Sequence, residues 1–169
     1  LNFQIFGLFH NDLGRSFAYA SIPSGLERLS SNFSGWSNGF IDFDNDGWKD
    51  IYSANGDVDD VSANSKQHDT MWRNLNGRKF EDFSMRLGAD FASAGYHRGS
   101  AFADLNNDGA MDIIVTALNE PPRILINSGN RNHWILLDMV GHRTNRDAIG
   151  ASVKVVMESG RTWYNRVST

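Results

Sequence analysis

The sequence has no cysteine among its 169 residues. This absence excludes disulfide bonds, thiolate metal sites and a cysteine nucleophile. It leaves the cellular compartment open, because many periplasmic and secreted proteins also lack cysteine.

Long apolar runs are absent as well. The two richest stretches, residues 111–118 and 133–140, are only as long as a strand, whereas a membrane-spanning helix needs about 20 apolar residues. The best helical pattern, residues 84–92, is interrupted by Gly88. We therefore expect no transmembrane segment and little helix. There is also no initial methionine and no signal-peptide pattern, and the chain reads as beginning in mid-fold.

The chain carries no excess of positive charge. Sixteen lysines and arginines stand against 20 acidic residues, which gives a formal net charge of −4. Because surfaces that bind nucleic acids are normally basic, this balance argues against a nucleic-acid partner.

Turn-forming residues are abundant instead. Sixteen glycines accompany only three prolines, and such sequences favour short strands joined by tight turns. The clearest strand-like segments are residues 39–43, 50–55, 70–76 and 79–84. The sequence therefore predicts an all-β fold.

An internal repeat organises these segments. Residues 9–21 match residues 72–84 at an offset of 63, and residues 39–54 match the segment that begins at residue 101 at an offset of 62. The matched pairs include Asn11 with Asn74, Gly14 with Gly77, Phe17 with Phe80, Ser21 with Ser84, Asp42 with Asp104, Gly47 with Gly109 and Asp50 with Asp112. A third copy begins at residues 124–130.

Four antiparallel strands in about 60 residues have the size of one β-propeller blade. We therefore expect residues 1–130 to form about two four-stranded blades and the start of a third. Propellers have roughly four to eight blades, so these form an incomplete ring that a longer chain or other subunits would complete. Residues 131–169 are expected to begin a small β domain.

Both copies contain an acidic loop of the pattern D-x-[DN]-x-D-G-x-x-D, followed by an apolar strand. Oxygen atoms at alternate positions of a curled loop converge on one point, and glycine at position 6 permits the sharp turn. A set of hard oxygens without histidine or cysteine favours Ca²⁺. The predicted ligands of two calcium sites are Asp42, Asp44, Asp46, Asp50 and the Trp48 carbonyl, and Asp104, Asn106, Asp108, Asp112 and the Ala110 carbonyl.

Two other interpretations of these loops compete with calcium binding. An EF-hand needs a glutamate at position 12, which is Ser53 in one loop and Val115 in the other. Asx-rich hairpin turns with solvated carboxylates are the simpler alternative, but the recurrence of the pattern in the same register favours metal binding. The second loop has Asn106 in place of a carboxylate, so we expect it to bind more weakly.

Residues 40–51 and 102–113 resemble the FG-GAP/VCBS-type repeats of calcium-binding β-propellers, and residues 71–84 are similar to the hairpin of that family. Residues 132–156 resemble the start of an ASPIC/UnbV domain, whose core pattern matches residues 144–151. Both family patterns are longer than the segments present here. The resemblance implies calcium-binding proteins outside the cytoplasm that act in adhesion or assembly.

The expected function is therefore that of a non-enzymatic, calcium-binding propeller module. It would offer a surface for protein or glycan partners in an extracellular or periplasmic location. Two alternatives stay open: a polysaccharide lyase or hydrolase built on a propeller, and a structural subunit of a larger surface or membrane-attached complex. No nucleophile-elbow, phosphate-loop or dinucleotide fingerprint is present.

Two further features invite a functional interpretation. The loop of residues 55–69 adds Asp57, Asp59, Asp60 and His68, which would be extra ligands or, more simply, a solvated connection. An exposed Trp48 would be able to stack on a sugar ring, although packing between blades is the simpler role.

Overall fold

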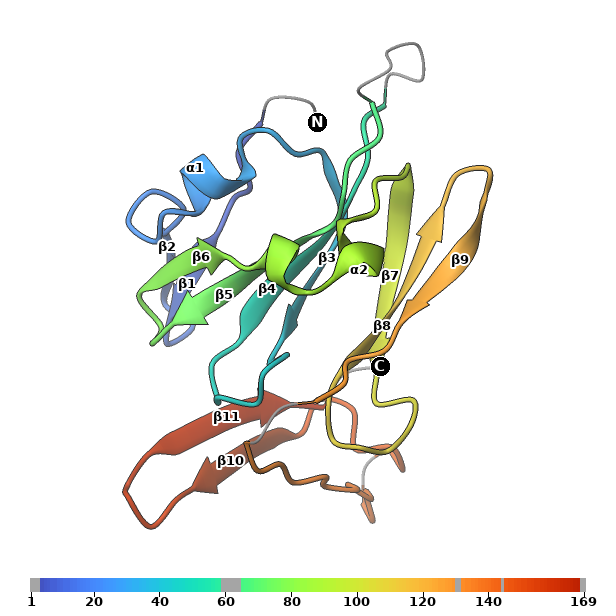
Figure 1. Cartoon of the computed structure of the whole chain (residues 1–169). Coiled ribbons are helices and arrows are strands. Elements are labelled where there is room, and N and C mark those ends of the chain that lie inside the picture. The colour runs from blue at the N-terminus through green and yellow to red at the C-terminus, as the bar shows by residue number, and fades with distance from the viewer. Residues whose placement is uncertain (1–3, 59–64, 130–131, 144, 168–169) are drawn as a thin grey trace. The chain divides into compact units, whose positions relative to one another are not determined.

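The computed structural model describes residues 4–58, 65–129, 132–143 and 145–167. The chain divides into two compact units, Leu1–His133 and Trp134–Thr169. The described residues are mostly β-structure in small antiparallel sheets, one of them four-stranded (Figure 1). This confirms that the fold is built mainly of β-strands in antiparallel sheets.

The four-stranded sheet, here called the first sheet, has the strand order β3-β4-β5-β6. Its strands are β3 (Gly35–Ile41), β4 (Asp50–Asn55), β5 (Thr70–Leu75) and β6 (Lys79–Asp82). They agree closely with the four segments expected from the sequence. All six residues of β4 are buried, because both of its faces are covered.

The second sheet has the order β7-β8-β9. Its strands are β7 (His97–Ala103), β8 (Asp112–Ala117) and β9 (Glu120–Leu125). A fourth strand was expected from the repeat, but the described residues contain none.

The two sheets pack against each other through one apolar cluster. It contains Ile41, Phe43, Tyr52, Ala54, Met71, Phe91, Ile113 and Val115. Residues of β4 and β5 thereby face residues of β8 across the layer. On the opposite face of the first sheet, Ile51 and Trp72 pack against Leu26 of the helix α1 (Leu26–Ser30).

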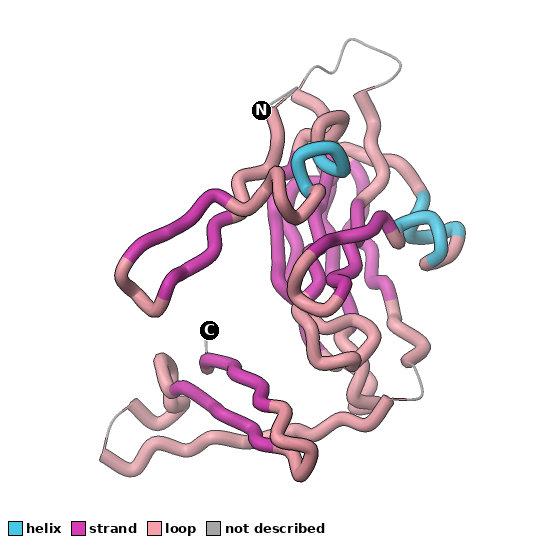
Figure 2. The backbone as a smooth tube through the Cα atoms, turned by 90° about the vertical axis from the view of Figure 1, so that its left-hand side faces the viewer, coloured by secondary structure: helices cyan, strands magenta, loops and turns pink. Residues whose placement is uncertain are grey.

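Helices are short and lie between strands (Figure 2). The expected helical segment is present as η1 (Ser84–Arg86) and α2 (Ala89–Ala92). It is divided at Gly88, whose φ of 95° lies in the left-handed region. The helix α1 was not predicted. No helix in the described part of the chain is long and apolar enough to cross a bilayer.

An exposed hairpin precedes the first sheet. It consists of β1 (Phe9–Asp12) and β2 (Ser16–Tyr19), which pair only with each other. Its turn uses the hydrogen bond from the Gly14 N–H to Asn11 Oδ1, at 2.7 Å. The turn between β5 and β6 uses the same bond, from the Gly77 N–H to Asn74 Oδ1, at 2.7 Å.

The second unit contains an antiparallel hairpin of β10 (Ser152–Val156) and β11 (Thr162–Arg166). The turn before it is ordered by the amide of Asn145, which accepts from the Ile149 N–H at 2.6 Å and donates to the Ile149 carbonyl at 3.1 Å. Thr144, the first residue of the expected core pattern, lies outside the described residues.

Candidate metal centre

The two acidic loops occupy equivalent places in the two sheets. One connects β3 to β4 and the other connects β7 to β8. Asn45 and Asn107 adopt φ values of 54° and 59°, and the following glycines, Gly47 and Gly109, adopt 87° and 83°. Asparagine and glycine tolerate this left-handed region best, which explains why the turn residues recur in both loops.

The first aspartate of each loop binds the backbone that curls around it. Asp42 accepts from the Asp46 N–H at 3.0 Å and from the Gly47 N–H at 2.9 Å. Asp104 accepts from the Asp108 N–H at 3.1 Å and from the Gly109 N–H at 2.8 Å. The two loops therefore share one hydrogen-bonded frame.

The last aspartate of each loop joins the loop to the third strand of its sheet or to the residues that directly follow that strand. Asp50 accepts from the N–H groups of Phe43, at 3.1 Å, and Asn74, at 2.7 Å. In the second loop, Asp112 binds the equivalent N–H groups of Leu105, at 2.9 Å, and Asn127, at 2.8 Å. Both aspartates are completely buried.

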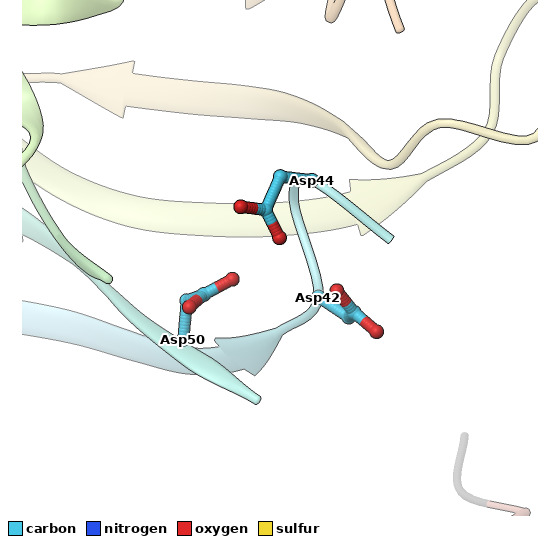
Figure 3. A group of neighbouring side chains, drawn as sticks. All are labelled: Asp42, Asp44 and Asp50. Atoms are coloured by element: carbon cyan, nitrogen blue, oxygen red, sulfur yellow. The ribbon is translucent and has the colours of Figure 1, made fainter. Parts of the chain in front are cut away.

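Three carboxylates of the first loop converge. Asp42, Asp44 and Asp50 each place one oxygen within 4.8 Å of the other two (Figure 3). Asp46 lies outside this group and accepts from the Trp48 N–H at 2.8 Å. The donor set consists of hard oxygens, so it fits a divalent cation such as Ca²⁺.

The second loop differs from the first at one of the predicted metal-ligating positions. Among the described residues, Asp42, Asp44 and Asp50 form the one group of three acidic side chains at metal-ligating distance. In the second loop, Asn106 replaces the middle carboxylate and donates its amide to Asp108 at 2.8 Å. The frame is preserved there, but the negative charge is lower.

A cation of the protein already touches the first loop. Arg73 on β5 places Nε 2.8 Å from Asp44 Oδ2 and Nη2 3.7 Å from Asp46 Oδ2. The contact between Arg73 Nε and Asp44 is an ion pair, but its geometry is not that of a hydrogen bond. The equivalent residue in the second sheet is the apolar Ile126, directly after β9. The repeat therefore did not predict an arginine at this site.

Crowding and burial oppose ionisation in the first loop. Burial raises the pKa of Asp50 from 3.8 to about 7, against hydrogen bonds from Asn74 and Phe43, and the charges of Asp44 and Asp42 add to the rise. Burial also raises the pKa of Asp42, while hydrogen bonds from Gly47 and Asp46 lower it. A bound cation would relieve the repulsion among these carboxylates.

The raised pKa of Asp50 predicts how stability depends on pH without metal. Between its unfolded and folded pKa values, the folded protein holds more protons, so its stability falls as pH rises through 7. From pH 6 to pH 8 in EDTA, we expect Asp50 to reduce the free energy of unfolding by about 1.4 kcal/mol. Urea denaturation at both pH values measures this change.

Asp50→Asn is the control for that measurement, because it removes the titrating group and leaves the histidines unchanged. The fall in the free energy of unfolding from pH 6 to pH 8 should be smaller in the variant. It should also be smaller in calcium, because Ca²⁺ competes with the proton. An equal pH dependence of the free energy of unfolding in wild type and variant would show that Asp50 does not cause it.

A second polar cluster, which the sequence did not reveal, lies between the two sheets. Asp69 accepts from Tyr52 Oη at 2.7 Å and pairs with His97 Nδ1 at 2.6 Å. Arg123 donates to His97 Nε2. Because a carboxylate can only accept, His97 Nδ1 donates to Asp69. Asp69, Tyr52 and His97 are all completely buried, which indicates a structural role.

The other residues for which the sequence suggested a functional role are packed in the structure or lie outside its described part. Trp48 is half-buried, and its ring occupies the space over Gly77, where an added Cβ would lie 2.5 Å from it. His68 packs edge-on against Phe33, with ring centres 5.1 Å apart. Asp59 and Asp60 lie outside the described residues.

Comparison with known proteins is consistent with this geometry. No curated protein matches the chain. A family model, described as an FG-GAP-like repeat, matches residues 42–115, the segment that begins with the first acidic loop and ends in β8.

Proposed function

We propose that this chain is part of a non-enzymatic β-propeller whose acidic loops bind Ca²⁺ for structural purposes. The convergence of Asp42, Asp44 and Asp50 carries this proposal. The FG-GAP-like match over the same segment supports it. In this interpretation, each sheet is a blade, and the metal fixes the loop between its two inner strands.

Calcium fits the first loop better than magnesium. Ca²⁺ accepts six to eight oxygens in flexible geometry, whereas Mg²⁺ demands a tight octahedron. Asp42, Asp44 and Asp50 would hold the ion in the first loop, with Asp46 and the Trp48 carbonyl as further ligands. Asp104, Asn106, Asp108, Asp112 and the Ala110 carbonyl would form a weaker second site.

Calcium titration of two reciprocal variants tests this proposal. Asp44→Asn gives the first loop the chemistry of the second, and Asn106→Asp does the reverse. We expect Asp44→Asn to weaken the tighter site at least about tenfold, because affinity follows the number of charged ligands. Asn106→Asp should strengthen the second site. Isothermal titration calorimetry measures both.

Asp12→Asn is the matched control, because Asp12 lies on the exposed hairpin far along the chain from both loops. It should leave calcium binding unchanged. The absence of calcium binding at millimolar concentration would contradict the proposal, as would equal affinities in wild type and Asp44→Asn.

The blades would present a rigid surface for protein or glycan partners outside the cytoplasm. Rigid sheets commonly carry their binding residues on connecting loops. We further propose that residues 131–169 belong to an ASPIC/UnbV-like domain, with the β10–β11 hairpin as its first strand pair. The resemblance of residues 144–151 to that domain's core pattern supports this assignment.

A further inference from the structure

Arg73 is a charged side chain that contacts the metal centre from outside its loop. It lies half-buried on β5, and its Nε is 2.8 Å from Asp44 Oδ2. Its Nη2 is 3.7 Å from Asp46 Oδ2, and its Nη1 is 3.9 Å from Glu81 Oε1. The guanidinium also lies over the ring of Phe83, 5.7 Å from the ring centre. Arg73 therefore contacts carboxylates of the first loop and of β6.

The ion pair between Arg73 and Asp44 involves a carboxylate of the metal centre. Asp44 is one of the three aspartates that converge at metal-ligating distance. The side chains of Asp44 and Arg73 are only 16% and 33% exposed, so water screens this pair less than an ion pair on an open surface. Arg73 Nε is buried and makes no hydrogen bond, so charge alone holds the contact. A guanidinium and a divalent cation would therefore bind the same carboxylate.

The second loop has an uncharged residue in the place of each partner of this ion pair. Asn106 is the repeat equivalent of Asp44, and Ile126 is the equivalent of Arg73. The first loop has four aspartates and the arginine, whereas the second has three aspartates. The extra carboxylate of the first loop is therefore accompanied by a cation from β5, and the two are absent together in the equivalent positions of the repeat.

We propose that Arg73 is an internal counter-cation that competes with Ca²⁺ for Asp44. In the metal-free loop, the guanidinium offsets the repulsion among the carboxylates and stabilises the fold. When Ca²⁺ binds, the guanidinium leaves Asp44. Arg73 therefore lowers the calcium affinity of the first loop, because its charge repels the ion and its contact has to be broken. The inference rests on the calcium site proposed above.

Glu81 gives the displaced guanidinium a carboxylate nearby. Arg73 and Glu81 lie directly opposite each other on β5 and β6, and opposite charges attract at this cross-strand spacing. The ring of Phe83 supports the guanidinium in the same region. The exchange of Asp44 for Glu81 therefore requires a change of side-chain conformation and no rearrangement of the sheet.

Calcium titration of Arg73→Met tests the competition, because methionine keeps an unbranched apolar side chain but removes the charge. Asp108→Asn is present in every protein, so that the second loop binds more weakly and the titration reports on the first. We expect Arg73→Met to raise the calcium affinity at least about threefold at low ionic strength. This gain should shrink at least about twofold between about 0.05 M and about 0.5 M NaCl, because salt screens charge repulsion but not packing.

Two further variants are matched controls for this titration. Arg86→Met removes the same charge from the same aromatic ring, since the Arg86 guanidinium lies 5.0 Å from the centre of the Phe83 ring. It should change the calcium affinity much less than Arg73→Met does. Arg73→Lys keeps the charge, so its calcium affinity should stay closer to that of the arginine protein than to that of Arg73→Met.

Urea denaturation in EDTA tests the stabilising role of Arg73 in the metal-free loop. Arg73→Met should raise the unfolding equilibrium constant at least about threefold, because the loop carboxylates lose their counter-charge. In the Asp44→Asn background, the same substitution should change the constant less than about 1.5-fold, because the partner is already gone. At about 10 mM calcium, the effect of Arg73→Met should disappear or reverse, since tighter calcium binding offsets it.

The second loop allows the reverse experiment, which also covers the case in which Arg73→Met does not fold. Asn106→Asp supplies the extra carboxylate, and Ile126→Arg then supplies the cation, with Asp46→Asn weakening the first loop. Ile126→Arg should lower the calcium affinity of the Asn106→Asp loop at least about threefold. Ile126→Met should leave that affinity nearly unchanged, because Ile126 is already 54% exposed.

The possible results separate this inference from the calcium proposal. Equal calcium affinities with and without Arg73→Met would overturn the inference and leave the calcium proposal intact. A gain in affinity that salt does not reduce would also overturn it, because that gain would come from packing. Calcium binding by neither protein would refute both. Calcium binding by Arg73→Met alone would support the competition, but it would contradict calcium binding by the natural chain.

Discussion

Asp69→Ala is expected to lower the free energy of unfolding by at least about 3 kcal/mol, because it removes the shared partner of a buried polar cluster. Asp69 accepts from Tyr52 Oη, from the Asn55 N–H at 3.1 Å and from His97 Nδ1. All four residues are completely buried. The substitution would leave three donors without an acceptor, and each buried orphan costs about 1–3 kcal/mol.

Urea denaturation measures this loss, and Tyr52→Phe calibrates it. Tyr52→Phe removes one of the three donors together with its need for an acceptor, so we expect a loss of about 1 kcal/mol. Burial and the neighbouring Asp69 carboxylate raise the pKa of Tyr52 above its ordinary value, so the hydroxyl stays a donor. An Asp69→Ala loss no larger than that of Tyr52→Phe would contradict the prediction.

The polar cluster joins the two sheets, so we expect Asp69→Ala to destabilise both of them. Tyr52 belongs to the first sheet, whereas His97 and Arg123 belong to the second. Arg123 also donates to the carbonyls of Asp90, at 3.1 Å, and Ser93, at 3.3 Å. One carboxylate therefore ties two sheets and α2 together. A small domain is stable by only about 5–15 kcal/mol, so the variant would sit close to unfolding.

The repeat made much of the fold predictable from the sequence. Strand segments with turn residues at both ends, such as residues 50–55 and 79–84, correspond to β4 and β6. The offsets of 62 and 63 also aligned loops whose hydrogen bonds prove equivalent. Such features depend on local turn chemistry and on period-two patterning, which a sequence displays directly.

Features that depend on distant contacts were not predictable. Asp69 and His97 are 28 positions apart, and neither has a neighbour that signals a partner. The helix α1 is only five residues long, and its N-cap residue, Gly25, provides no side-chain hydrogen bond. The repeat also predicts a fourth strand in the second sheet, and the described residues contain only three.

The candidate site was predicted in outline but not in its internal division of roles. Loop spacing alone predicts five equivalent ligands in the first loop, whereas the structure brings together Asp42, Asp44 and Asp50 and turns one oxygen of Asp46 toward Trp48. Arg73 comes from another strand, so loop spacing gave no sign of it. Asn74 was matched as a turn residue, but its N–H also holds Asp50.

Asp50→Ala is the second substitution with a large expected effect. In EDTA at pH 6, it should lower the free energy of unfolding by about 2 kcal/mol or more, because the N–H groups of Phe43 and Asn74 lose their acceptor. The raised pKa of Asp50 reduces this loss at pH 8, where ionisation of the buried carboxyl is itself destabilising.

Calcium should enlarge the loss in a way that a purely structural role for Asp50 would not. At 10 mM Ca²⁺ and a Kd of about 10⁻³ to 10⁻⁴ M, the bound ion adds about 1.4–2.7 kcal/mol to the wild type. Asp50→Ala would lose most of this calcium-dependent stabilisation. Urea denaturation in calcium and in EDTA separates the two contributions.

Asp112→Ala is the matched comparison, because Asp112 holds the same two N–H groups in the second loop. Its loss in EDTA should be similar to that of Asp50→Ala, since both are buried acceptors of two backbone bonds. Its calcium-dependent loss should be smaller, because Asn106 leaves the second loop with one charge fewer. Equal losses for Asp50→Ala in calcium and in EDTA would show that the crowded carboxylates of the first loop serve hydrogen bonding alone.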